Sequence, residues 1–383
     1  FFIWVFFGGI GVVSHGLFAA LSVLVVACPC VIGLATPVAL AAGLNKAARN
    51  HILIRDTSAL EQMRNVDVVV FDKTGTLTEG HPTVIGWLWA QGQEDHYKDV
   101  LLAAESTSDH PLAEAIVTAL EGEEQVIPAH LDGFESIAGK GVRVAYQGAE
   151  YWVGSHKLLK DYQANLSDIL ADMLTQYESD GNSIVYFGRE NDLLAVIAIK
   201  DQLRVTSMEA IRELRTQDIE ICMLTGDGER TASSVAGSLG IMRFVADAMP
   251  DDKEDFIHKL QLQGKTVAMV GDGVNDAQAL SCADVSIAMG KGTDTLMDTA
   301  MITLRTSDLL LLPKVFRLSR QTVSLMYRNL FWAFIYNTVG IFVAAGVLYP
   351  VYDILLSPAL AGAAMALSCV SVALSSLRLS SRF

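Results

Sequence analysis

The sequence predicts an α/β fold, built on a doubly wound parallel sheet, that is joined to apolar transmembrane helices. Three observations predict it: valine-rich strands that each end at an aspartate-containing turn, helical patterns between those strands, and long uncharged segments on either side of them. The 383 residues are 51% hydrophobic and carry a net charge of −15. From this acidic balance we expect no nucleic-acid partner.

Uncharged segments near both ends of the chain predict helices that cross a membrane. Residues 1–45 carry no formal charge when His15 is taken as neutral, and we expect one full crossing at about residues 16–44. The stretches between Arg328 and Asp353 and between Asp353 and Arg378 are each long enough for another crossing. Basic residues flank these segments on one side only, which places the large middle part in the cytoplasm. We therefore expect a multi-pass protein in contact with lipid, in a plasma membrane or a bacterial inner membrane.

The cysteines indicate a reducing compartment. There are five, an odd number, and Cys28, Cys30 and Cys369 lie in the apolar segments. We expect from this count no disulfide framework.

Three apolar strands of the middle part are each followed by a polar turn. The strands are expected at residues 66–71, 219–224 and 266–270, and helices at 207–215 and 252–262 lie between them. In a parallel, doubly wound sheet the ligand site lies beyond the carboxyl ends of the strands, where all three turns fall. The turns are Asp72-Lys73-Thr74-Gly75-Thr76, Thr225-Gly226-Asp227 and Gly271-Asp272-Gly273.

A large insertion separates the first turn from the other two. It has strands of its own, expected at residues 142–146, 151–153, 184–187 and 193–199, and therefore predicts a second domain. We therefore predict membrane helices at residues 1–45, including the helix with the two cysteines. The domain with the parallel sheet has two parts, residues 46–82 and 200–313, and the inserted domain between them is residues 83–199. Residues 314–383 form two further membrane helices with a basic flank.

The polar turns carry the groups that phosphoryl transfer needs. A carboxylate at the end of a strand, here Asp72, can attack a γ-phosphate and form an aspartyl-phosphate. Because an anion approaching a polyanion is repelled, the site needs Mg²⁺, a lysine and backbone N–H groups. Asp272 and Asp276 are hard oxygen ligands suited to Mg²⁺, Lys253 supplies a positive charge and Thr225 a hydroxyl. Taken singly these strings are ordinary turns, but their order along the chain favours phosphoryl transfer.

With these motifs the chain resembles the heavy-metal (CPx-type) class of P-type ATPases, copper-transporting subclass, over essentially its whole length. The string from Asp72 to Thr76 matches that family's phosphorylation motif. The resemblance implies a haloacid-dehalogenase-like phosphorylation domain with an inserted α+β nucleotide-binding domain, and ATP and Mg²⁺ as cofactors. The implied catalytic residues are Asp72, Lys73, Thr74, Thr225, Asp227, Lys253 and Asn275, and the implied Mg²⁺ ligands are Asp72, Thr74, Asp272 and Asp276.

Two short motifs of the insertion support this resemblance. Glu105 and, five residues later, His110 resemble the adenine-site motif of the heavy-metal class. Gly139 and Gly141 resemble its glycine pair, whose missing side chains let the backbone approach the nucleotide. The alternatives are a helix start at His110 and a simple turn at the glycines. Ser155 stands where the family has asparagine, which puts that nucleotide contact in doubt.

Cys28-Pro29-Cys30 predicts a site for a soft metal ion inside the first apolar segment. Proline removes one helical hydrogen bond and opens the helix where two thiolates can converge. Thiolate ligands select Cu(I) and also suit Zn²⁺. Two cysteines that pack as small hydrophobic residues are the alternative, but the Gly-Leu-Ala-Thr-Pro string at 33–37 resembles the family's ion-binding helix.

Polar side chains in the last two apolar segments indicate which ion is bound. Such side chains are costly within a bilayer and point to function. They resemble the Tyr-Asn pair and the Met-x-x-Ser-Ser string of the copper subclass, whereas the lysine and aspartate of the zinc subclass do not occur there. Two thiolates without a carboxylate neutralise a monovalent ion better, so we expect Cu(I), with Ag(I) as a mimic. The residues are Tyr336, Asn337, Met365, Ser368 and Cys369, the last either a further ligand or a packing residue.

The sequence therefore predicts ATP-driven transport of Cu(I) or Ag(I) through an aspartyl-phosphate, with copper delivered by a chaperone. The Thr-Gly-Glu string of the family's actuator domain does not occur in it. We expect a fragment that lacks this domain and the early membrane helices and is incomplete for turnover. The alternatives are a zinc or cadmium pump, and a soluble-type phosphatase fused to an anchor, which leaves Cys28, Cys30 and the insertion unexplained.

Overall fold

A computed structural model describes residues 1–8, 13–90, 97–108, 110–123, 126–164, 168–272, 276–290 and 300–381. The chain divides into two compact units. Phe1–Arg64 and Lys314–Phe383 form one, here called the helical unit, and Asn65–Pro313 form the other, here called the α/β unit. The predicted fold class, an α/β part combined with long apolar helices, is confirmed.

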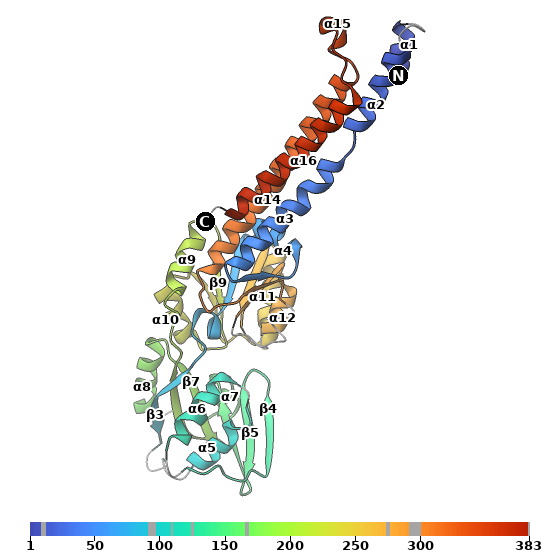
Figure 1. The fold of residues 1–383 in the computed structure, drawn as a ribbon. Helices are drawn as coiled ribbons and strands as arrows, with labels where there is room; N and C mark the ends of the chain where they lie inside the picture. The colour runs from blue at the N-terminus through green and yellow to red at the C-terminus, as the bar shows by residue number, and fades with distance from the viewer. Residues whose placement is uncertain are drawn as a thin grey trace. The chain divides into compact units, whose positions relative to one another are not determined.

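A parallel sheet forms the centre of the α/β unit, with strands in the order β13-β12-β11-β2-β9-β10 (Figure 1). Strand β2 lies between β9 and β11, and Val70 is paired with Cys222 on one side and with Met269 on the other. All residues of β2 are buried, which explains its unbroken apolar run. The strands are β2 (Val68–Asp72), β9 (Glu220–Leu224), β10 (Arg243–Val245), β11 (Val267–Gly271), β12 (Val285–Met289) and β13 (Ile302–Leu304).

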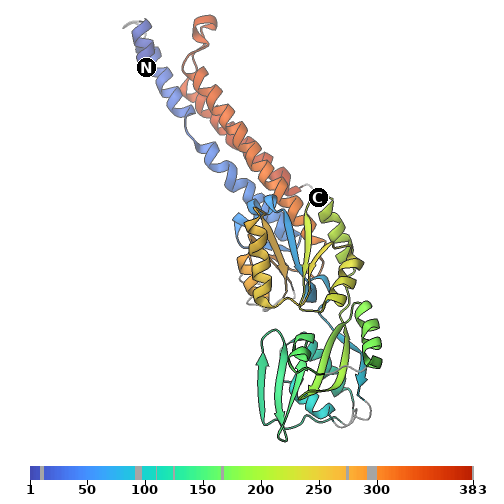
Figure 2. The ribbon, with the colours of Figure 1, turned by 180° about the vertical axis from the view of Figure 1, so that it is seen from behind.

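Helices cover both faces of this sheet (Figure 2). Helices α9 (Ser207–Arg215) and α10 (Glu229–Leu239) contact each other on one face. On the other face, α11 (Pro250–Leu262) and α12 (Ala277–Cys282) pack into the same apolar cluster as β2 and β11. Helix α11 begins two residues before its predicted start because Pro250 occupies its first turn and the carboxylate of Asp252 accepts a hydrogen bond from the N–H of Met249 (2.9 Å).

The insertion folds as an antiparallel sheet in the order β3-β8-β7-β6-β5-β4. One face packs against α5 (Lys98–Glu105) and α6 (Pro111–Glu121). The other face packs against α7 (His156–Asp161) and α8 (Asp168–Ser179). Each predicted strand is present and is longer than predicted at one end or at both. The strands are β3 (Thr83–Trp89), β4 (Gly133–Ile137), β5 (Gly141–Tyr146), β6 (Ala149–Gly154), β7 (Ser183–Arg189) and β8 (Asp192–Lys200).

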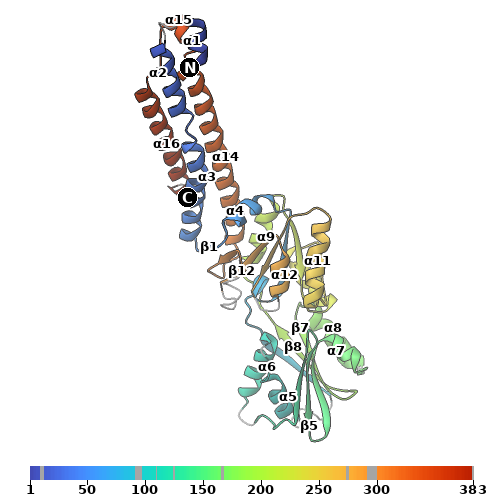
Figure 3. The same ribbon diagram turned by 90° about the vertical axis from the view of Figure 1, so that its right-hand side faces the viewer.

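Long helices make up most of the helical unit (Figure 3). Helix α16 packs against α2 and α3, and Ala333 of α14 shares an apolar cluster with α3 and α16. Large apolar side chains such as Phe6, Leu24 and Leu367 remain exposed, as expected of helices that face lipid. The helices are α1 (Phe2–Gly8), α2 (Val13–Val26), α3 (Cys30–Arg49), α4 (Thr57–Gln62), α14 (Leu311–Ala344), α15 (Tyr349–Tyr352) and α16 (Pro358–Ser381), and β1 (Ile52–Ile54) follows α3.

Two stretches of the described residues are long and apolar enough to cross a membrane, Val13–Arg49 and Pro358–Leu379. Helix α14, which contains much of the other predicted crossing, does not reach that hydropathy. The polar residues Arg328, Asn329 and Asn337 lie in the apolar half of this helix, which ends at Ala344, and they lower its mean hydropathy.

Candidate phosphoryl-transfer site and metal centre

The carboxyl edge of the parallel sheet brings three predicted aspartates and a lysine together. Asp72 is the last residue of β2, and Asp272 directly follows the adjacent strand β11. The Nζ atom of Lys253, on α11, lies 2.6 Å from Oδ1 of Asp72 and 2.7 Å from Oδ1 of Asp276. Lys253, Asp72 and Asp276 are all buried. We call Asp72, Asp272 and Asp276 the carboxylate cluster.

The carboxylate cluster has a large excess of negative charge. One oxygen of each of its members lies within 4.8 Å of the others. Burial, together with the charge of Asp72, raises the pKa of Asp272 and of Asp276 to about 7. Burial acts to lower the pKa of Lys253, but Asp72 and Asp276 outweigh it and the pKa is raised. These hard oxygen donors and their mutual repulsion fit a Mg²⁺ ion.

The turn that follows Asp72 packs directly against this cluster. Gly75 has φ 69°, and a Cβ atom there would lie 1.4 Å from Oδ2 of Asp272, so only glycine fits. The backbone N–H of Gly75 donates to Oγ1 of Thr78 (2.9 Å). Thr74 has extended backbone angles (φ −72°, ψ 129°), and the buried Oγ1 of Thr76 has no hydrogen-bond partner among the described residues. An unpaired buried hydroxyl beside the carboxylates fits an oxygen-rich ligand such as a phosphoryl group.

A second ion pair forms from the other predicted catalytic residues. The Nζ atom of Lys73 lies 2.5 Å from Oδ2 of Asp227 and donates to Oγ of Ser183 (3.0 Å) on β7. The hydroxyl of Thr225 donates to the same Asp227 oxygen (2.9 Å). Burial acts to raise the pKa of Asp227, but Lys73 outweighs it and the pKa is lowered. The predicted catalytic residues therefore form two groups, one around Lys253 and one around Lys73. The remaining predicted residue Asn275 lies outside the described residues.

Two residues that support the phosphorylation turn were missed from the sequence. The buried guanidinium of Arg204 donates to the backbone carbonyls of Thr76 (2.9 Å) and of Gly75. The carboxylate of Asp201 accepts from the Thr78 hydroxyl (2.5 Å) and the Gly80 N–H (3.1 Å). Asp201 directly follows β8, where the chain leaves the inserted sheet, and Arg204 comes three residues later. An aspartate and an arginine three positions apart at such a junction were the available signal.

The two predicted adenine-site residues lie at helix ends. Glu105 is the last residue of α5 and is buried, and burial raises its pKa to about 7. His110 precedes α6, and its Nδ1 atom accepts a hydrogen bond from the N–H of Leu112 (3.2 Å). This is the helix-start role that the sequence left as the alternative. Desolvation lowers the pKa of His110, and the charges of Asp227 and Lys73 also act on it.

The backbone of the inserted sheet itself requires glycine at the two predicted positions. Gly139 has φ 68° and Gly141 has φ 145°, backbone conformations that favour glycine. A Cβ atom on Gly141 would lie 2.1 Å from the carbonyl oxygen of Val153 on the neighbouring strand β6. The close approach of β5 to β6 is therefore enough to explain why residue 141 is glycine. Whether Gly139 and Gly141 also contact a nucleotide stays a prediction.

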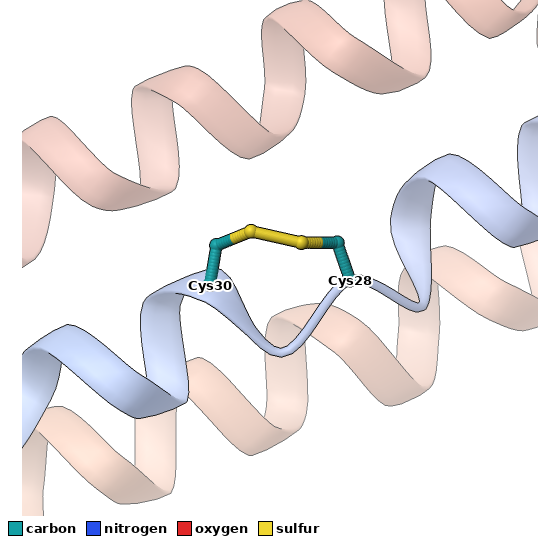
Figure 4. Close-up of a disulfide and its surroundings, with 2 residues drawn as sticks. All are labelled: Cys28 and Cys30. Carbon is teal, nitrogen blue, oxygen red and sulfur yellow. A yellow bond between two sulfur atoms is a disulfide. The ribbon is translucent and has the colours of Figure 1, made fainter.

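The helix of the first apolar segment is broken at Pro29, between the end of α2 at Val26 and the start of α3 at Cys30. Figure 4 shows the side chains of Cys28 and Cys30 turned toward each other and joined by a disulfide. The cysteine count predicted no disulfide framework, but this pair is joined, because the break leaves the two Cα atoms only 5.5 Å apart. Because thiolates are the form that binds metal, the reduced pair is the one suited to an ion.

The other predicted ion-site residues are placed unequally in the helical unit. Met365 and Cys369 of α16 pack against an apolar cluster that includes Val31, the residue after Cys30. Asn337 and Ser368 are buried, and their oxygens Oδ1 and Oγ have no hydrogen-bond partner among the described residues. Buried polar atoms without partners are costly and fit a ligand.

Tyr336 differs from these residues. Its side chain is 47% exposed and stacks on Trp332, with ring centroids 5.8 Å apart. Neighbouring helix positions point in different directions, so Asn337 turns inward while Tyr336 faces out. The structure therefore does not bring Tyr336 to the buried polar residues.

The fold and the carboxylate cluster define the class of protein, and comparison with known proteins agrees. Residues 66–284 match the model of the haloacid dehalogenase-like hydrolase family, and the chain belongs to this family. The chain is also 43% identical to a copper-exporting P-type ATPase of Legionella pneumophila over 99% of its length. It is 44% identical to a silver exporting P-type ATPase of Salmonella typhimurium over 100% of its length. These relatives confirm the resemblance to P-type ATPases.

The chain spans about half the length of the curated relatives it matches, 51% and 46% of these two. Among solved structures, a zinc-transporting PIB-type ATPase in an E2.Pi state is similar with a TM-score of 0.64 and 34% identity, over 92% of this chain and 56% of that one. The catalytic domain of a CPx-ATPase, described as changing conformation upon nucleotide binding, is similar with a TM-score of 0.59 and 28% identity. That match covers 71% of this chain and 97% of the domain.

Proposed function

We propose that the chain is the catalytic and rear membrane part of a pump that transports Cu(I) or Ag(I), using ATP and an aspartyl-phosphate formed on Asp72. The observation that carries this proposal is the carboxylate cluster, in which Lys253 forms ion pairs with Asp72 and Asp276. A nucleophilic carboxylate, a lysine and two spare carboxylates on one sheet edge are the parts that phosphoryl transfer to an aspartate requires. Relatives named as copper and silver exporters support the choice of ion.

Asp72 is the nucleophile in this proposal. One of its carboxylate oxygens forms a bond to the γ-phosphorus of ATP, and the bond between that phosphorus and the β–γ bridging oxygen breaks, which releases ADP. Lys253 holds the carboxylate of Asp72 in position before the reaction. Asp272 and Asp276, with the backbone carbonyl of Thr74, would hold Mg²⁺, which offsets the negative charge of the phosphates. Because both carboxyls have raised pKa values, they release any proton when the cation binds.

The inserted sheet is proposed to bind the nucleotide. Its Ser183 contacts Lys73 at the phosphorylation turn, so the sheet is anchored beside the lysine and aspartate pair. His110, at the start of α6 in the same domain, is proposed to orient the adenine. The similarity to a CPx-ATPase catalytic domain that responds to nucleotide supports this assignment.

The helical unit is proposed to be integral to a membrane and to carry the ion, with the catalytic part in the cytoplasm. Exposed apolar side chains and two stretches of sufficient hydropathy support contact with lipid. Reduced Cys28 and Cys30, with Met365 and Asn337 or Ser368, would give a soft site without a carboxylate, which favours a monovalent ion. Delivery of copper by a chaperone is part of the proposal. A zinc or cadmium pump is the second candidate, because a zinc-transporting ATPase is among the similar structures.

The test is phosphorylation of the reduced chain in lipid vesicles by labelled ATP, with Cu(I), Ag(I), Zn²⁺ or no metal. We expect acid-stable label that hydroxylamine removes and that Cu(I) and Ag(I) increase. Stimulation by Zn²⁺ alone would favour the second candidate. No label under any condition would contradict the assignment of Asp72.

A further inference from the structure

A second group of metal-ligand side chains lies outside the carboxylate cluster, on α11 and α12. Glu254 and His258 are one helical turn apart on α11, and Cys282 is the last residue of α12. One ligand atom of each lies within 4.8 Å of the other two. The Glu254 Oε1 and His258 Nε2 atoms are 3.5 Å apart, close to the separation of about 3.3 Å that two ligands of a tetrahedral zinc ion require.

Gln261 forms hydrogen bonds with two residues of this group, His258 and Cys282. Its Nε2 atom donates to the backbone carbonyl of Cys282 (2.8 Å), which leaves its Oε1 atom 3.1 Å from Nδ1 of His258. A carboxamide oxygen can only accept, so Nδ1 is the nitrogen that donates to it, and Nε2 is the ring nitrogen that faces Glu254. Metal-binding histidines are commonly held in this way by a hydrogen bond to the other ring nitrogen. The sulfur of Cys282 also lies 3.9 Å from the hydroxyl of Ser281.

We propose that Glu254, His258 and Cys282 bind a divalent ion of the zinc class, in a site separate from the transported ion and from Mg²⁺. The donor set of one oxygen, one nitrogen and one sulfur is typical of Zn²⁺. A carboxylate, a thiolate and a neutral imidazole together neutralise a charge of +2, whereas the two thiolates of the membrane segment match a monovalent ion better. The side chains of His258 and Glu254 are 50% and 36% exposed, so the ion can enter and water can take a fourth position.

This site would connect the two helices that position the phosphoryl-transfer groups. Glu254 directly follows Lys253, which contacts Asp72 and Asp276. Asp276 directly precedes α12, and Cys282 lies at the other end of that helix. An ion at this position therefore cross-links α11 to α12 and fixes the spacing between Lys253 and Asp276. The inference concerns the α/β unit alone and does not depend on which ion the helical unit carries.

The test is a Co²⁺ titration of the full chain in detergent, reduced and without an affinity tag. Cys28→Ser and Cys30→Ser are introduced together in every sample, which removes the two thiols of the first apolar segment. We expect a thiolate-to-cobalt charge-transfer band with the strong visible absorption of tetrahedral Co²⁺, and we expect Zn²⁺ to displace it. In the same background, Cys282→Ser should abolish the band, and His258→Gln should weaken Co²⁺ binding at least tenfold.

Two further variants separate a site from a general loss of structure. Gln261→Leu should weaken binding by roughly 10-fold to 100-fold because the imidazole loses its partner. His130→Gln, at an exposed histidine outside the group, should leave binding unchanged. Zn²⁺ should raise Tm in the background protein and not after Cys282→Ser. A band that survives Cys282→Ser, or no band at any Co²⁺ concentration in the background protein, would overturn the proposal.

Discussion

The carboxylate cluster of the α/β unit and the cysteine segment of the helical unit are both polar sites in apolar surroundings, but their polar atoms are satisfied differently. At the carboxylate cluster the chain supplies its own cation, Lys253, at hydrogen-bond distance from two carboxylates. In the helical unit, the buried oxygens of Asn337 and Ser368 have no partner among the described residues. The two sulfurs, of Cys28 and Cys30, are bonded only to each other.

This difference has a physical reason. A buried ion pair that loses one partner is strongly destabilising, so a site that must hold several carboxylates before its ligand arrives needs a lysine of its own. Neutral amides, hydroxyls and thiols cost less to bury, and they can stay unpaired until a ligand binds. We infer that the proposed phosphoryl-transfer site is preformed, whereas the proposed soft-metal site would be completed by its ion. The predictions below test this contrast, beginning with the largest expected effect.

Replacement of the nucleophile should break the α/β site without disturbing its shape. Asp72→Asn keeps the size of the side chain and removes the oxygen that attacks, so we expect complete loss of acid-stable, hydroxylamine-sensitive label. ATP binding, measured by calorimetry, should remain within about threefold of the starting protein. Label at the original level in this variant would contradict the role of Asp72.

Replacement of one sulfur should break the membrane site. Cys28→Ser should abolish Cu(I) binding by the helical unit, because a hydroxyl is a poor ligand for a soft ion. The reduced starting protein should bind, and the disulfide form should not. X-ray absorption at the copper edge measures the sulfur ligands, and the control is Cys222→Ala, a buried cysteine of the parallel sheet. An equal number of sulfur ligands after Cys28→Ser would argue against the site.

Gly75→Ala should show how little space the preformed site has. The added Cβ would meet Oδ2 of Asp272 at 1.4 Å in a backbone conformation that favours glycine. We expect a decrease of roughly 2 to 4 kcal/mol in the free energy of unfolding, together with weaker Mg²⁺ binding. Gly148→Ala is the matched control, because Gly148 has φ 78° but nothing within 4 Å of its Cβ position. Its cost should be about 1 kcal/mol with no effect on Mg²⁺.

The pH dependence of thermal stability should also distinguish the carboxylate cluster from the cysteine segment. Asp272 and Asp276 have pKa values of about 7 in the folded chain, against about 4 when unfolded. Without a cation, their contribution to stability is therefore full below about pH 4 and is lost as the pH rises through about 7. Mg²⁺ relieves the repulsion between ionised carboxylates, so it should raise Tm more at about pH 8 than at about pH 6. The residues proposed for the soft-metal site, Cys28, Cys30, Asn337, Met365 and Ser368, include no carboxylate.

Whether this Mg²⁺ effect arises from the carboxylate cluster can be checked with Asp272→Asn. This variant removes one negative charge and should make the Mg²⁺-dependent rise in Tm smaller and less dependent on pH. An unchanged pH dependence, measured by thermal unfolding with and without Mg²⁺, would mean that other carboxyl groups are responsible.

The smallest effect is expected at Cys369. Its side chain packs at the edge of the apolar cluster of α3, α14 and α16, next to Met365. Cys369→Ser restores the residue usual in the copper subclass and should change Cu(I) affinity by less than about tenfold. A loss comparable with that of Cys28→Ser would make Cys369 a ligand rather than a packing residue.

The sequence by itself determined the parallel sheet and the residues at its carboxyl edge. Valine-rich strands buried on both faces leave a strong local signal, and a strand that ends in Asp72 or Gly271 must place the following turn at the same edge. The break at Pro29 was equally predictable, because proline cannot donate the helical hydrogen bond. These features depend on neighbours in the chain.

Only the tertiary structure decided which charges pair. Lys73 contacts Asp227 while Lys253 contacts Asp72, although Lys73 is next to Asp72 in sequence. Arg204 and Asp201 support the turn at residues 73–78 from more than 120 positions away, so their spacing in the sequence did not show which residues they contact. The outward direction of Tyr336 likewise follows from how α14 is packed, because only one side of that helix is buried. The physical reason is that composition fixes which groups are present, whereas packing fixes which of them share one low-dielectric space.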